Sequence, residues 1–120
     1  MVSESDISKQ LQIYASSKGH RLWRNNSGAF RDATGRMIRY GLGNTSSQIN
    51  KRWKSSDLIG CTNDGRFVAI EVKSPDWVYR DSDERAVAQL KFIETIRSLD
   101  GLAGFARNEE ELERIFNNER

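Results

Sequence analysis

Two acidic residues and a lysine in the middle of the chain have types and spacing suited to metal-assisted chemistry. Glu71 and Lys73 stand two apart at the end of an apolar segment, and Asp57 begins another apolar segment earlier in the chain. Hard divalent cations prefer carboxylate oxygens, and an ammonium group stabilises developing negative charge. With Mg²⁺ on Asp57 and Glu71, and Lys73 beside it to orient a water molecule or to stabilise charge, the set suits hydrolysis of a phosphodiester bond.

Residues 57–61 and 67–73 are expected to form a β-hairpin, because each run is apolar and the connection contains Asp64-Gly65. Side chains alternate along a strand, so one face of 67–73 is expected to be core and the other to present an exposed Glu71 and Lys73 at the rim of the sheet. The expected core face carries Val68, Ile70 and Val72, and the other carries Phe67, Ala69, Glu71 and Lys73.

The same residues have a plainer interpretation. Glu-x-Lys is a frequent surface pair on strands, and an Asp at this distance occurs by chance in many proteins. The context favours a site, because Glu71 and Lys73 end a strongly apolar strand and follow a basic segment.

The elements that must position these residues follow from apolar periodicity and capping residues. A helix capped by Ser3 is expected to stop near Gly19, followed by a short strand over 20–24. Residues 29–56 show only a weak pattern, which indicates a basic excursion without long elements. A helix over 84–99, a strand over 102–106 and a helix capped by Asn108 complete an α/β domain with a central mixed sheet flanked by helices.

Positive charge is concentrated in one part of the chain. Residues 20–54 contain eight Lys or Arg against one acid, Asp32, so this segment could face phosphates. Its aromatic side chains could stack on bases, although Trp23 is expected to belong to the core. The residues expected to contact nucleic acid are Arg24, Asn25, Ser27, Arg31, Arg36, Arg39, Lys51, Arg52 and Lys54.

Composition limits the other classes of protein. The 120 residues are enough for one domain, with 37% hydrophobic and 30% charged residues. No segment approaches the roughly 20 apolar residues of a membrane span, and the first residues do not have the pattern of a signal peptide. The single cysteine, Cys61, is expected in the core, and it fits a reducing, cytoplasmic location.

At this point the chain resembles a known family, the VRR-NUC branch of the PD-(D/E)XK nuclease superfamily. The motifs that carry the resemblance are Ser56-Asp57, Glu71-Val72-Lys73 and Gln89, and it extends over nearly the whole chain, residues 1–120. Supporting features are an acid in the first helix, the turn over 24–28, and the segment 101–105. One departure is Ser56, where the superfamily name has Pro; this position supplies no catalytic group.

The resemblance implies a restriction-endonuclease-like fold and a structure-selective DNA endonuclease. It implies Mg²⁺ or Mn²⁺ on Asp57, Glu71 and the main-chain carbonyl of Val72, with Lys73 catalytic, and with Gln89 and Glu4 supporting the site; Glu4 is a further candidate metal ligand. Stand-alone members resemble Holliday-junction resolvases that act as homodimers on branched DNA and are often encoded by phages, which would place the protein in the host cytoplasm.

Two alternatives stay open on the sequence. One is a non-catalytic nucleic-acid-binding module in which the carboxylates are structural, although the full set of Asp, Glu and Lys argues against it. The other is a nuclease that acts on flaps or linear ends, which could function as a monomer.

Overall fold

The computed structural model describes residues 2–119, and its helices and strands follow the predicted order of a helix, a β-rich middle and an α-β-α end. The predicted α/β class with a mixed sheet flanked by helices is confirmed. The elements are α1 (Glu4–Ser17), β1 (Arg21–Arg24), β2 (Gly28–Arg31), β3 (Met37–Tyr40), α2 (Ser47–Arg52), β4 (Leu58–Cys61), β5 (Phe67–Val72), α3 (Glu84–Ser98), β6 (Leu102–Ala106) and α4 (Glu109–Phe116).

The central sheet has the strand order β1-β4-β5-β6. Strand β4 is antiparallel to β1 and to β5, as the predicted hairpin requires for the second pair, and β6 is parallel to β5. The connection from β5 to β6 contains α3, which is the long crossover that a parallel pair needs. The end of β1, the start of β4 and the end of β5 therefore lie side by side at one end of the sheet.

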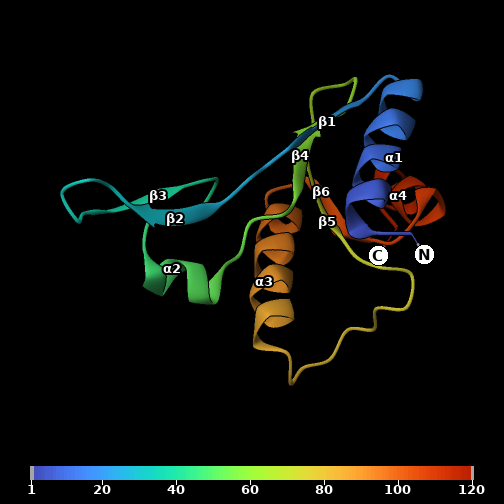
Figure 1. Ribbon diagram of the computed structural model, residues 1–120. Helices are drawn as coiled ribbons and strands as arrows, with labels where there is room; N and C mark the ends of the chain where they lie inside the picture. The colour runs from blue at the N-terminus through green and yellow to red at the C-terminus, as the bar shows by residue number, and fades with distance from the viewer. Residues whose placement is uncertain (1, 120) are drawn as a thin grey trace.

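Helices cover both faces of this sheet (Figure 1). On one face α1 and α4 pack against a core that contains Leu11, Val68, Ile70 and Leu112, all fully buried. On the other face α3 packs through Ile93 and its neighbours against β5 and β6. Burial on both faces is the main source of stability, at about 25 cal/mol per Å² of apolar surface.

The helix starts follow from polar caps that satisfy free backbone N–H groups. Ser3 accepts a hydrogen bond from the backbone of Asp6, as predicted, and Asn108 does the same for Glu111 at the start of α4. The chain leaves α1 through Gly19, whose φ of +86° suits glycine. These local signals fix where α1 and α4 lie against the sheet.

Residues 28–54, called the basic arm below, form the part that the sequence left without long elements. Strands β2 and β3 pair with each other as a separate two-stranded sheet, and the short helix α2 follows. Figure 1 shows the hairpin projecting away from the central sheet, while α2 lies beside α3. The expectation of an excursion is confirmed, and its content is a hairpin and one short helix.

Two expected core residues are on the surface instead. Trp23 is 56% exposed, because β1 is an edge strand and turns Leu22, at 4%, toward α1. Cys61 is also exposed, at the end of β4. The expectation that both belong to the core was wrong, because strands of four residues show too little alternation to assign a side chain to a face. Among residues 2–119, no helix has the length and hydropathy of a membrane-spanning segment.

Candidate active site

The candidate site begins as a row of residues across the ends of three strands. Leu58 pairs with Ile70 in the antiparallel register of β4 and β5, so the next pair along is Asp57 with Glu71. Residues directly opposite each other in such a pair point to the same side, with Cβ atoms about 5 Å apart. Two acidic side chains thus meet at the edge of the sheet, as the sequence predicts.

Asp57 is exposed and has its orientation fixed by a backbone contact. Its Oδ2 accepts a hydrogen bond from the backbone N–H of Val72, with 3.0 Å between nitrogen and oxygen. Its own carbonyl oxygen accepts from the backbone N–H of Asn25 at 2.7 Å. Because one carboxylate oxygen is held by the main chain, the other is directed to the space beside the sheet.

Glu71 is buried, which corrects the expectation of an exposed strand residue. It is 4% exposed because α3 covers its face of β5. Its Oε1 accepts from Gln89, whereas Oε2 has no hydrogen-bond partner among residues 2–119. The pKa of Glu71 is raised from 4.5 to about 9, chiefly by burial and next by the charge of Asp57, while Lys73 and Arg85 oppose the shift.

Lys73 is joined to this carboxyl group through Gln89. The Nζ of Lys73 donates to Oε1 of Gln89 at 2.9 Å, and Nε2 of Gln89 donates to Glu71 at 2.9 Å. Lys73 is 9% exposed and Gln89 is 2% exposed, so Lys73 is buried where an exposed residue was expected, and Gln89 does not face solvent. One amide fixes both the lysine and the glutamate, as expected of a residue that supports the site.

Aromatic rings form the other wall around Lys73. Its Nζ lies 5.0 Å from the centre of the Trp77 ring and 5.8 Å from that of Phe105. These are cation–π distances, so the two rings help to hold the lysine side chain in place inside a covered site. The Trp77 and Phe105 rings contact each other, with centroids 4.7 Å apart. No sequence pattern assigned Trp77 to the site.

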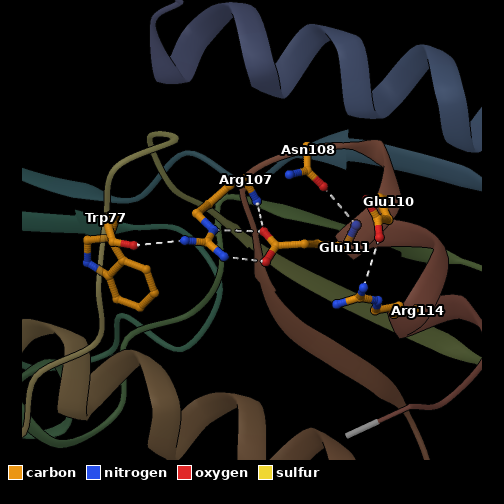
Figure 2. A network of polar contacts seen from close by, with 6 residues as sticks. All are labelled: Trp77, Arg107, Asn108, Glu110, Glu111 and Arg114. Carbon is orange, nitrogen blue, oxygen red and sulfur yellow. Dashed lines mark hydrogen bonds and ion pairs between the residues drawn. The ribbon is translucent and has the colours of Figure 1, made fainter.

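The segment that carries Trp77 is tied to the start of α4 by the network in Figure 2. Arg107 donates to the carbonyl oxygen of Trp77 at 3.2 Å and pairs with Glu111 at 2.7 Å. Burial raises the pKa of Glu111, but the hydrogen bonds from Arg107 outweigh this effect and lower it overall. This pairing holds the loop after β5 in place, and with it the ring against which Lys73 rests.

Two cavities meet at Asp57. The first, of about 250 Å³, lies between the basic arm, α3 and the ends of β4 and β5, and it contains both Asp57 and Glu71. The second, of about 210 Å³, lies between α1 and the sheet and contains Glu4, Asp57 and Val72. Glu4 is therefore on the α1 side of Asp57, in a different cavity from Glu71.

The residues expected to contact nucleic acid divide into two groups. Some line these cavities, and others lie outside them on the basic arm, where Lys51 and Arg52 line a separate shallow hollow beside Trp53. The expected residues that line the two cavities are Arg24, Asn25, Ser27, Arg39 and Lys54; Arg31, Arg36, Lys51 and Arg52 are outside them.

Sequence reasoning missed Arg85, which also lines the first cavity. Its position four residues before Gln89, on the same helix face, is the signal that could have found it.

The carboxylate pair has the chemistry of a divalent-cation site. Among residues 2–119, no group of three or more His, Cys, Asp or Glu side chains gathers in the manner of a metal centre, and the acidic residues opposite each other at this place are Asp57 and Glu71. Among residues 2–119 the Oε2 of Glu71 has no partner, and the pKa of this carboxyl group is raised, so its ionised form lacks a compensating positive charge. A cation bound between the two carboxylates would relieve both, and oxygen ligands suit Mg²⁺ or Mn²⁺.

Comparison of the sequence with models of protein families gave no match, and comparison with curated proteins gave none either. The assignment of a function to this site therefore depends on its residues and their geometry.

Proposed function

We propose that this chain is a metal-dependent nuclease that hydrolyses phosphodiester bonds in DNA. The observation that carries the proposal is the buried Glu71, whose Oε2 lacks a partner and whose neighbour across the strands is Asp57. Its connection to Lys73 through Gln89 adds a cation at the same place. A buried ionisable group without a compensating partner costs stability, so its retention favours a functional role over a structural one.

The residues divide the work in a way that suits phosphodiester hydrolysis. Asp57 and Glu71 would hold Mg²⁺ or Mn²⁺, and the chemistry that a bound cation supplies is Lewis-acid polarisation of the phosphate. Lys73 would orient the attacking water or stabilise negative charge on the phosphate as the bond breaks. Gln89 and the Trp77 ring keep the ammonium in position, and the cations of the basic arm attract the nucleic acid.

The finer assignment follows the resemblance to VRR-NUC nucleases. It comprises a restriction-endonuclease-like fold, action as a homodimer in the cytoplasm, and cleavage of branched DNA such as a Holliday junction. The central mixed sheet with helices on both faces and the projecting arm support this assignment. The arm offers a surface outside the catalytic edge with which a branched substrate or a second copy could make contact.

A cleavage panel tests the proposal. Labelled four-way junction, flap, splayed arm, duplex and single strand are incubated with Mg²⁺, with Mn²⁺ or with chelator, and the products are separated on denaturing gels. We expect paired nicks near the branch point of the junction with either metal, and none in chelator. Cleavage at flaps or ends alone would show that the protein processes DNA ends and does not resolve junctions. Binding without cleavage of any substrate would identify a non-catalytic module.

A further inference from the structure

The first cavity contains a cluster of cations in addition to its carboxylates. Arg39 from β3, Lys54 from the end of the basic arm and Arg85 from α3 all line it, together with Asp57 and Glu71. The basic arm supplies two of these cations and α3 supplies the third, so two parts of the chain distant in the sequence bring positive charge to one small polar space. Lys73, the cation of the proposed catalytic centre, is not part of this cluster.

Among residues 2–119 the three cations form no direct ion pair, although the charge of Arg85 acts on Glu71, which lines the same cavity. Burial lowers the pKa of Lys54, and the charge of Arg85 lowers it further, so the two side chains are close enough to repel each other. Like charges held together in a cavity favour an anion that bridges them.

The cluster is held in place by hydrogen bonds. The backbone N–H of Lys54 donates to the carbonyl of Ala88 at 3.1 Å, and its Nζ donates to the side chain of Asn50. Arg39 donates to Asn44 at 3.1 Å, and Asn44, only 5% exposed, donates to two backbone carbonyls of the β2–β3 hairpin. Two of the three cations are therefore positioned before any ligand arrives, which lowers the entropic cost of binding.

We infer that Arg39, Lys54 and Arg85 form a subsite for a second backbone phosphate of the nucleic acid, next to the phosphate that is cut. This inference rests on the proposed function. A backbone phosphate fits better than a free anion because the cationic surface continues outward along the arm, where Phe30 and Tyr40 are 54% and 48% exposed and can stack on bases. The subsite would fix the substrate strand in register with Asp57 and Glu71.

Binding of modified DNA tests the subsite separately from cleavage. Proteins carrying Lys73→Ala, to prevent cutting, are titrated with labelled junctions that each contain one neutral methylphosphonate at successive positions around the branch, and with unmodified junction at several salt concentrations. Arg85→Gln is the test variant, because Arg85 is exposed and its loss should leave the fold intact; Lys54→Gln is a second. Arg66→Gln is the matched control, since Arg66 lies at the opposite end of β4 and β5.

Arg85→Gln should make the negative slope of log affinity against log salt concentration shallower by about one, as expected for the loss of one phosphate contact. The parent protein, which carries only Lys73→Ala, should bind more weakly when the methylphosphonate occupies one particular position. Arg85→Gln should remove this sensitivity, and Arg66→Gln should change neither the salt slope nor the sensitivity. An unchanged methylphosphonate profile in both Arg85→Gln and Lys54→Gln would overturn the subsite. Binding of inorganic phosphate that requires Arg85, together with a methylphosphonate profile that the variants leave unchanged, would also overturn it. The site would then bind a free anion and not a phosphate of the DNA backbone.

The two failures can be told apart. Wild-type protein that cuts no DNA in the cleavage panel but shows the Arg85-dependent profile would refute the nuclease and leave the subsite standing. Wild-type protein that cuts DNA while the variants keep the parental profile would do the reverse.

Discussion

Replacement of Lys73 by alanine should reduce the rate of Mg²⁺-dependent DNA cleavage by at least about a hundredfold, the usual effect of removing one group that stabilises charge in a transition state. The physical reason is the position of Nζ, which is linked through Gln89 to the carboxyl of Glu71. Single-turnover cleavage of a labelled junction measures the rate. DNA binding should change little, because phosphate contacts come mainly from the basic arm.

Controls separate loss of chemistry from loss of structure. Lys73→Met keeps the aliphatic part of the side chain against the Trp77 and Phe105 rings but loses the hydrogen bond to Gln89, so it should unfold at a higher temperature than Lys73→Ala while its cleavage rate matches that of Lys73→Ala. Lys91→Ala removes a lysine from the exposed side of α3 and should cleave normally. Wild-type cleavage by both Lys73 variants would contradict the assignment of this lysine.

Replacement of Glu71 by glutamine should make the metal-free protein more stable at high pH and inactive as a nuclease. The pKa of Glu71 is raised from 4.5 to about 9, chiefly by burial, so the folded protein retains a proton that the unfolded chain releases. The stability of the wild type therefore falls as pH rises from about 4.5 to about 9. Glutamine stays neutral throughout and avoids this loss.

Chemical denaturation between pH 4.5 and 9 in chelator measures the effect. Near pH 4.5 the two proteins should have similar free energies of unfolding, and near pH 9 the variant should exceed the wild type by at least about 1.4 kcal/mol, the equivalent of one pKa unit. Saturating Mg²⁺ should stabilise the wild type more than the variant, because a ligand stabilises the state that binds it. Parallel curves for the two proteins in chelator would show that Glu71 is not an unpaired buried carboxyl.

The proximity of Asp57 and Glu71 could be predicted because it depends on strand register. The apolar alternation of 67–72 and the Asp64-Gly65 turn determine which residues of β4 and β5 lie opposite each other, and this register brings Asp57 to Glu71. Their burial could not be predicted in the same way. Alternation separates the two faces of a strand, but it does not reveal that α3 covers the second face. The residue of α3 that contacts Lys73, Gln89, lies sixteen residues later in the chain.

The basic arm shows a different limit. Its strands are four residues each and its helix has six, which is too short for periodicity to stand out, and β2 and β3 pair only with each other. The order of the arm depends on tertiary hydrogen bonds, such as the one from Asn44 to Gly28 and the one from the backbone N–H of Leu42 to Asn25. Trp77 escaped sequence reasoning for the same reason, because its neighbours come from other elements, whereas the spacing between Arg85 and Gln89 on α3 was a signal that could have been used.

The measurement that tests the central claim most directly is metal rescue of a sulfur-substituted substrate. One non-bridging oxygen of the scissile phosphate is replaced by sulfur, and wild-type cleavage is compared in Mg²⁺ and in Mn²⁺. If a cation held by Asp57 and Glu71 contacts the phosphate, one sulfur isomer should be cut much more slowly than the oxygen substrate in Mg²⁺, and Mn²⁺, which accepts sulfur better, should restore much of the rate. Equal rates for the oxygen substrate and both sulfur isomers in Mg²⁺, or cleavage that persists in chelator, would contradict the account.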